Sequence, residues 1–306
     1  MAEKDITEKI LMLYADVFAD CINVLQYNGE QRLTEENTKP APTESFYKGQ
    51  KAHNQLCDAS RYLLDDKNII AQYIIENAIR LSERQILRKV SYEGGAYRQQ
   101  LESSMPVHAV ICIVIAWTGK TNRIPLSLRR LLGKNGVPAK ELDQVADAKL
   151  TVYHMRSLPP EVRKRFVSDM GFVVDYLNEG NFEGRKNQKI IHLEALCDMM
   201  EALTGDTRFT EQMAKLLEKE QKEGHIMMCE YINALEARGE ARGEATGAKK
   251  GEAKLSSLLQ QLYALGRDDD AKLAVQDLDA RARLYKEFSI PNYIYENKQD
   301  NAGEHA

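Results

Sequence analysis

The pattern of apolar and polar positions divides the chain into a first part with mixed helices and strands and a second part that is helical throughout. Residues 5–28 carry apolar side chains at three- and four-residue spacing, which predicts an amphipathic helix that ends at Gly29. Residues 34–50 combine prolines and Gly49 with polar residues, so we expect a loop there.

Strand patterns follow this loop. The segments 55–64 and 69–75 flank the polar turn "DDKN" and predict a β-hairpin. The segment 107–117, "VHAVICIVIAW", is an almost continuous β-branched run, which predicts a central strand buried on both faces. Residues 83–102, between the hairpin and this central strand, predict a helix with a weak point at Gly94 and Gly95. Residues 149–158 predict a further strand.

After residue 160, apolar residues recur at helical spacing. The order of elements therefore predicts an α/β fold with a mixed-sheet core and appended helices. We expect the core at 1–180, a helical extension at 181–235, a glycine repeat at 236–254, C-terminal helices at 255–290 and a disordered tail at 291–306. The C-terminal helices are also a candidate surface for homo-oligomerisation.

The glycine repeat, "EARGEARGEATGAKKGEA", places a glycine at every fourth residue from Gly239 to Gly251. Each glycine inside a helix costs about 1 kcal/mol relative to alanine, so this segment forms either a flexible linker or a marginal helix. We favour the linker.

Composition excludes several classes of protein. The five cysteines are scattered and contain no CxxC pair, which argues against a disulfide framework and a zinc site and favours the cytoplasm. The N-terminal segment is charged and has no apolar signal region, and the longest apolar stretch is shorter than the ~20 residues that span a bilayer. We therefore expect a soluble protein without a membrane partner.

Two carboxylates interrupt the apolar hairpin, Asp58 in "LCDAS" and Glu76 in "IIEN". Glu76 either marks the solvent-exposed end of its strand or is an acid held at the edge of the core to bind a ligand. Two carboxylates on neighbouring strands raise each other's pKa unless a cation lies between them. Mg²⁺ is the cation that sites of one or two carboxylates, water and phosphate prefer. A pair of solvated strand ends remains the alternative.

Charge is unevenly distributed. The net charge is −4, yet residues 103–140 contain no Asp or Glu and carry basic residues, namely Lys120, Arg123, Arg129, Arg130, Lys134 and Lys140. A local basic surface in an acidic protein is typical of a polyanion-binding site. A solvated helical face is the alternative.

Several long segments then show a resemblance. The blocks "EKDITEKILMLYADVFADCINVLQYNGEQ", "CDASRYL", "IENAIRLSERQILRKVSYEGGAYRQQL", "SLPPEVRKRFVSDMGFVVDYL", "ALTGDTRF" and "RGEARGE" occur in one order between about residues 3 and 255. Together they resemble the PD-(D/E)XK nuclease family transposases, also called the Rpn family of recombination-promoting nucleases. The resemblance implies a restriction-endonuclease-like core and Mg²⁺-dependent (or Mn²⁺-dependent) hydrolysis of DNA phosphodiesters by a bacterial, cytoplasmic endonuclease.

The resemblance also implies site residues. Asp58 and Glu76 fall on the catalytic and metal-binding acids, and Asp20 (with Asp16 one turn earlier) falls on a helix that often keeps an acid near the metal; a solvated helix face is the alternative for these two. Arg88 and Tyr92 match a basic and aromatic pair suited to phosphate contact, and packing is the alternative for Tyr92. We add Arg123, Arg129, Arg130 and Lys134 from the basic segment as candidate DNA contacts.

One position departs from the family pattern. The third catalytic residue, Gln or Lys, is Ala78 here, and the small hydroxyl residue that usually follows is Ile79. Alanine neither orients water nor stabilises charge on phosphate. Gln72 and Lys89 are polar residues nearby in sequence, and Gln72 is the first candidate for the missing role. The two hypotheses are therefore an active DNA endonuclease and a catalytically impaired DNA-binding or interaction protein on the same fold.

Overall fold

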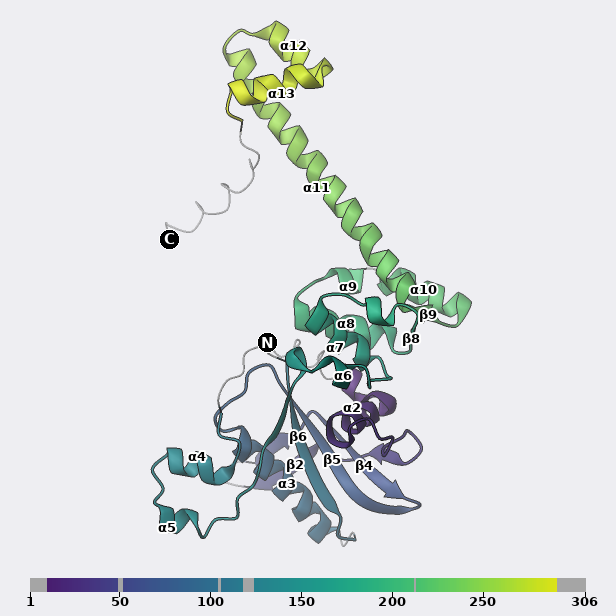
Figure 1. The fold of residues 1–306 in the computed structure, drawn as a ribbon, viewed down its shortest axis with the longest axis vertical. Coiled ribbons are helices and arrows are strands. Elements are labelled where there is room, and N and C mark those ends of the chain that lie inside the picture. Colours follow the sequence, from purple (N-terminus) through teal and green to yellow (C-terminus); the bar gives the residue numbers. More distant parts are fainter. Residues whose placement is uncertain (1–9, 49–51, 104–105, 118–123, 212, 291–306) are drawn as a thin grey trace. The chain divides into compact units, whose positions relative to one another are not determined.

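The computed structural model describes residues 10–48, 52–103, 106–117, 124–211 and 213–290 (Figure 1). The chain forms two compact units, residues 1–232 and 233–306, which are described separately below. The helical extension belongs to the same compact unit as the sheet.

The first unit is built on a five-stranded mixed sheet in the order β1-β4-β5-β6-β7. Strands β1, β4 and β5 pair antiparallel, whereas β5, β6 and β7 pair parallel. The strands are β1 (Thr38–Pro40), β4 (Ala59–Asp65), β5 (Asn68–Ala78), β6 (Ala109–Ala116) and β7 (Thr151–His154). The α/β class with a mixed sheet, the hairpin around residues 65–68 and the buried strand in 107–117 are therefore confirmed.

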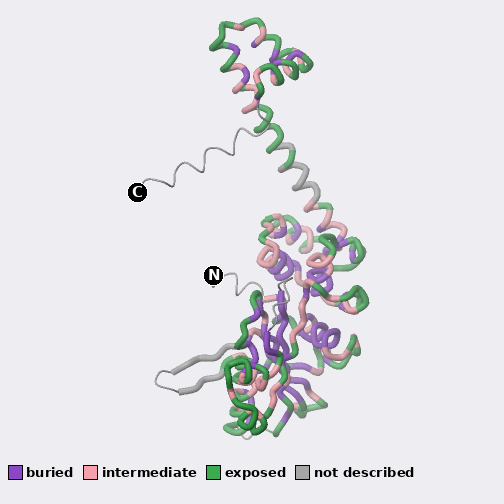
Figure 2. The backbone as a smooth tube through the Cα atoms, turned by 60° about the vertical axis from the view of Figure 1, so that its left-hand side comes forward, coloured by how far each residue is buried: buried purple, intermediate pink, exposed green. Residues whose placement is uncertain are grey.

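Helices cover both faces of this sheet, and the strand interiors are buried (Figures 1 and 2). Helix α2 (Ala15–Tyr27) contacts one face, where the hydroxyls of Tyr27 and Tyr73 hydrogen-bond. Helix α3 (Gln85–Glu102) packs on the other face, where Ile74 and Cys112 contribute to one apolar cluster. Successive residues of a strand point to opposite faces, so Ile74, Glu76 and Ala78 all point toward the α3 side.

Two predictions near the start of the chain were wrong. The expected loop at 34–50 contains strands β1 and β2 (Glu44–Lys48), and β2 pairs with β3 (Ala52–Leu56) in a separate two-stranded ribbon. The expected single strand at 55–64 is interrupted, because the chain leaves this ribbon after Leu56 and enters the main sheet at Ala59. Sequence pattern alone did not show this change of partner, because strand pairing joins residues far apart in the chain.

The helix expected at 5–28 is interrupted among the described residues, where Ile10 is already helical. A short 3-10 helix at Leu11–Leu13 precedes α2, and the chain breaks helical geometry at Tyr14, whose ψ is 137°. The end at Gly29 is confirmed, because Asn28 and Gly29 both have left-handed backbone conformations. Helix α3 is continuous through Gly94 and Gly95.

Helical segments follow the sheet. After β6 come α4 (Leu128–Lys134) and α5 (Ala139–Leu142), and after β7 come α6 (Pro160–Arg163), α7 (Met170–Glu179), α8 (Leu193–Thr204), α9 (Arg208–Glu211) and α10 (Met213–Glu223). Two short strands, β8 (Lys189–Ile190) and β9 (Ile226–Met227), pair within this region, which the sequence predicted to be entirely helical.

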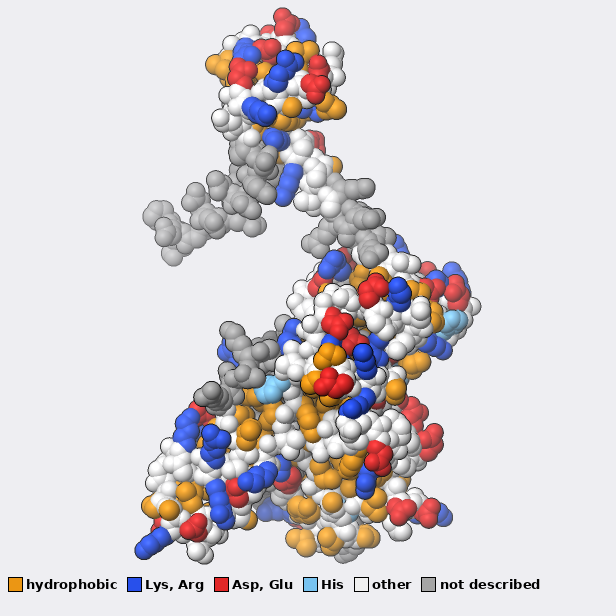
Figure 3. Space-filling view, viewed as in Figure 1, with side chains coloured by type: hydrophobic (Ala, Val, Ile, Leu, Met, Phe, Trp, Pro, Cys, Tyr) orange, Lys and Arg blue, Asp and Glu red, His pale blue; other side chains and the backbone are white. Residues whose placement is uncertain are grey.

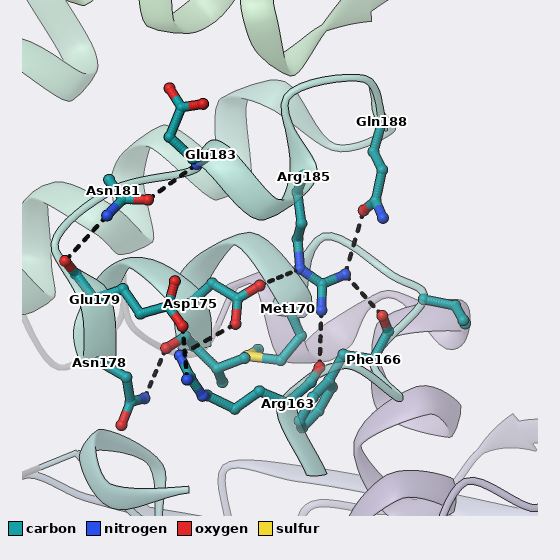
Figure 4. A network of polar contacts seen from close by, with 12 residues as sticks. Arg163, Phe166, Met170, Asp175, Asn178, Glu179, Asn181, Glu183, Arg185 and Gln188 are labelled. Carbon is teal, nitrogen blue, oxygen red and sulfur yellow. Dashed lines mark hydrogen bonds and ion pairs between the residues drawn. The ribbon is translucent and has the colours of Figure 1, made fainter. Parts of the chain in front are cut away.

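A buried network of polar contacts joins these helices (Figure 4). Asp175 pairs with both Arg163 and Arg185, whose side chains are only 6 % and 5 % exposed. The Arg185 guanidinium also donates to the carbonyl oxygens of Phe166 and Arg163 at 2.8 Å and to the Gln188 side chain at 3.2 Å. Buried charges need such partners, so this network fixes how the loop before α8 packs on α7.

The second unit contains most of α11 (Met228–Ala264), together with α12 (Asp268–Gln276) and α13 (Leu278–Glu287). Apolar residues of the three helices pack together, among them Leu258, Ala271 and Leu284. The glycine repeat lies inside α11, so the favoured linker is not found and the helical alternative holds. Alanine, arginine, glutamate and lysine fill all the other repeat positions except Thr246, and their helix propensities offset the glycines.

Among the described residues, no helix combines the length and the apolar composition that crossing a bilayer requires. The expected tail at 291–306 lies outside the described residues.

Candidate functional site

The two hairpin carboxylates meet in one hollow at the end of β5. Glu76 is in β5 and Asp58 directly precedes β4, and the register pairs Ala59 with Ile75, so Asp58 lies opposite Glu76. Both line a hollow of about 230 Å³ together with Asn77, Ala78, Gln85 and Arg88. We call it the carboxylate hollow. The two acids therefore line the same hollow, as the sequence predicted for two neighbouring segments.

Glu76 is buried, with only 2 % of its surface exposed. Its neighbours on the same face of β5 are Ile74 and Ala78, and its partner on β6 is Val114, so along β5 and toward β6 its neighbours are apolar. The interpretation of Glu76 as a solvent-exposed strand end is therefore wrong. A buried carboxylate is stable only with a cation or hydrogen-bond donors.

Helix α3 supplies both. Arg88 forms an ion pair with the Oε1 atom of Glu76 and donates a hydrogen bond of 2.9 Å to the Tyr92 hydroxyl. Burial and the charge of Glu76 raise the pKa of Tyr92. Burial alone would lower the pKa of Arg88, but the Tyr92 hydrogen bond and the Glu76 charge outweigh it and raise that pKa. The side chain of Arg88 is 54 % exposed, so a charged guanidinium links the buried acid to solvent.

Asp58 is fixed by the end of β5. One of its carboxylate oxygens accepts a hydrogen bond of 2.6 Å from the backbone N–H of Asn77. The Asn77 side-chain oxygen in turn accepts a bond of 3.0 Å from the Trp117 indole. These contacts hold the residue that joins the two β-hairpins against the strand that carries Glu76.

The donor set fits a hard divalent cation that retains water and phosphate ligands. Asp58 and Glu76 provide two carboxylates, the number that Mg²⁺ sites often use. Among the described residues, no group of three or more His, Cys, Asp or Glu side chains could hold a metal. Burial, with the charges of Glu76 and Asp58, raises the pKa of the Cys57 thiol to about 12.

Ala78 brings no polar group to the carboxylate hollow. It packs with Ile86, Val114 and Leu131 in an apolar cluster. The two polar residues considered as substitutes are engaged elsewhere. Gln72 donates to Ser60 Oγ at 3.0 Å and does not line the hollow, and Lys89 pairs with Glu93.

Asp20 and Asp16 lie apart from the carboxylate hollow. The buried Asp20 carboxylate accepts hydrogen bonds from the backbone N–H groups of Val167 and Ser168 at 3.0 and 2.8 Å, and from the Ser168 hydroxyl. Burial raises the pKa of Asp20. Asp16 bonds to the His192 ring at 2.9 Å. Asp20 therefore fixes the turn before α7, and the structure does not join it to Asp58 and Glu76.

The basic segment has mixed roles. Arg129 donates to the Val145 carbonyl oxygen at 2.7 Å, and Lys134 pairs with Glu83, whereas Arg130 is exposed. Arg123 lies outside the described residues. Basic side chains gather over the region of α4 and α5, with acidic ones among them (Figure 3). Arg130 is thus the described arginine of this segment most available to a partner.

Gln85, the first residue of α3, was missed by the sequence reasoning. It is 3 % exposed and lines the carboxylate hollow. No spacing or motif in the sequence marks it, because only the packing of α3 on the sheet brings it to Glu76.

Comparison of the chain with models of known protein families, with curated proteins and with solved structures finds no match.

Proposed function

We propose that this protein is a Mg²⁺-dependent DNA endonuclease of the PD-(D/E)XK transposase type, with its active site in the carboxylate hollow. The observation that carries the proposal is that the buried Glu76 and the half-buried Asp58, from two adjoining segments of the chain, line one polar hollow with Arg88. A buried ionisable group with a charged partner at the wall of a hollow is a physical ground for a functional site.

Each side chain has a role in this proposal. Asp58 and Glu76 would hold the cation, which supplies charge stabilisation for the phosphate and an activated water. Arg88 neutralises Glu76 when no cation is bound and, being half exposed, is able to turn toward a phosphate oxygen of DNA. The exposed Arg130 would contact the DNA backbone without reading sequence.

The apolar environment of Ala78 favours a second candidate function, a DNA-binding or interaction protein with impaired catalysis. A site that lacks one group for the transition state still binds, because that group acts mainly on the rate. The two candidates share the fold and the cation site and differ in turnover.

Plasmid cleavage by the purified full chain tests the proposal. We expect nicked or linear product with Mg²⁺ or Mn²⁺, none with EDTA, and a loss of at least about 10²-fold for Asp58→Asn and for Glu76→Gln.

Asp175→Asn is unsuitable as a control because it disturbs the fold, whereas Asp269→Asn removes an exposed ion pair with Lys272 in α12 and should cleave like the native chain. DNA binding without cleavage in every divalent cation would favour the second candidate. Equal cleavage by Asp58→Asn, Glu76→Gln and the native chain would refute an active site in the carboxylate hollow.

A further inference from the structure

The polar residues around the carboxylate hollow differ in their hydrogen-bond partners. Asp58 accepts from Asn77, and Glu76 pairs with Arg88. Gln85 differs from them: among the described residues no hydrogen bond to its side-chain amide is found, although the residue is only 3 % exposed. Its amide atoms are not among the fully buried side-chain atoms that lack a partner, so the amide is open to the hollow that the residue lines.

The position of Gln85 suggests a role for its side chain. Its backbone begins α3, where the N–H donates to the Ser82 carbonyl at 3.0 Å. Its side chain lines the same hollow as Glu76 and Ala78. The adjacent residue, Ile86, packs against Ala78 in the apolar cluster, so the first turn of α3 lies directly over the position that lacks a polar group.

We infer that Gln85 is the third active-site residue and takes the role that Ala78 does not fill; this inference rests on the proposed endonuclease function. An amide offers an oxygen that accepts from water and an N–H₂ group that donates to a phosphate oxygen. Gln85 reaches the hollow from the helix, whereas a residue at position 78 would reach it from the strand.

The chemistry needs only orientation and charge stabilisation from this residue. Hydrolysis forms a P–O bond to the water oxygen and breaks the P–O bond to one sugar oxygen. One water proton passes to solvent, and the departing sugar oxygen takes up a proton from solvent. The amide of Gln85 neither gains nor loses a proton; it orients the water and donates to a phosphate oxygen. Loss of one such donor typically lowers the rate about 10²- to 10³-fold.

The matched variants are Gln85→Leu and Gln100→Leu, at two buried glutamines of α3. Gln100 is satisfied, because its side chain bonds to the backbone of His108 at 3.1 and 3.3 Å. Gln85→Leu should lower single-turnover cleavage about 10²- to 10³-fold and leave the urea midpoint of the full chain unchanged or higher. Gln100→Leu should lower the urea midpoint and leave cleavage unchanged.

Two further variants give readouts that a structural role would not produce. Ala78→Gln combined with Gln85→Leu should restore cleavage, since it returns an amide to the hollow from β5. Gln85→Glu should tighten Mn²⁺ binding, measured by calorimetry without DNA, about tenfold, because it adds a carboxylate to the hollow.

The outcomes separate this inference from the proposed function. Cleavage by Gln85→Leu at the native rate, with Asp58→Asn inactive, overturns the role of Gln85 and leaves the endonuclease in place. Absence of cleavage by the native chain overturns the role of Gln85 as well, together with the endonuclease. If the native chain then still binds Mn²⁺ and Asp58→Asn abolishes that binding, the cation site of the impaired candidate stands. If the native chain binds no Mn²⁺, the cation site is refuted too.

Discussion

Gly171 and Gly94 allow one substitution to be tested in two opposite environments. Both glycines lie inside helices, Gly171 in α7 and Gly94 in α3, and neither has a positive φ. A Cβ atom at Gly171 would lie 2.3 Å from Nη1 and 2.4 Å from Cζ of Arg185, whereas a Cβ atom at Gly94 would meet no atom within 4 Å. Only at Gly171 does the absence of a side chain serve a close approach.

The guanidinium of Arg185 has little freedom to move aside from a new methyl group. It donates to Asp175 at 2.5 Å and to three other oxygen atoms, and its side chain is 5 % exposed. Overpacking a buried site costs about 1–3 kcal/mol. Displacing Arg185 instead would break a buried ion pair, which costs about 3–5 kcal/mol. We expect Gly171→Ala to lower the free energy of unfolding by about 3 kcal/mol.

The same substitution in α3 should have the opposite sign. Gly94→Ala replaces an uncovered helical glycine, so it should raise the free energy of unfolding by about 0.5–1 kcal/mol. Urea unfolding is followed by fluorescence of Trp117, the only tryptophan, which is buried in the first unit. Equal urea midpoints for Gly171→Ala and the native chain, or equal losses for the two variants, would refute the reasoning.

Three further predictions concern the site and its surroundings. Ala78→Gln alone should leave Mn²⁺ affinity unchanged, measured by calorimetry, because the ligand oxygens remain; a loss of affinity would mean that Ala78 shapes the site. Arg130→Ala should weaken binding of all DNA sequences and reduce the slope of log affinity against log salt concentration by about one, without changing the fold. Arg129→Ala should also lower the urea midpoint. If Arg130→Ala binds DNA as the native chain does, Arg130 is only a solvated residue. Burial opposes protonation of His192, but the hydrogen bond and charge of Asp16 outweigh burial and raise the His192 pKa above the ordinary value of 6.5. The stability that this pair contributes should therefore be full below about pH 6.5 and should be lost as pH rises through the folded pKa. Urea midpoints against pH check this, and Asp16→Asn should remove the slope; an unchanged slope would contradict it.

The hydrophobic pattern alone located most elements that depend on local sequence. The β-branched run at 107–117 contains β6, the two segments around residues 65–68 form the β4–β5 hairpin, and Gly29 ends the first helix. These features follow from backbone preferences and from alternation between faces, which adjacent residues determine together. The α/β class therefore followed from the sequence.

Strand partners did not follow from the sequence. The break at Cys57 and Asp58 arises because β3 pairs with β2 and β4 pairs with β1 and β5. It places Asp58 between two sheets, where it accepts from Asn77. Pairing of this kind depends on segments that are distant along the chain, so no local sequence pattern predicts it.

The sequence by itself determined the chemical type of each candidate site residue. It showed Asp58 and Glu76 amid apolar neighbours, and an alanine at position 78 where the family has a polar residue. Only the tertiary structure decided their environments. Packing of α3 on the sheet buries Glu76 beneath Arg88 and brings Gln85 into the carboxylate hollow, while the turn before α7 engages Asp20. Burial and hydrogen bonding depend on which elements meet in space, and those determine whether a carboxylate binds a ligand or holds a turn.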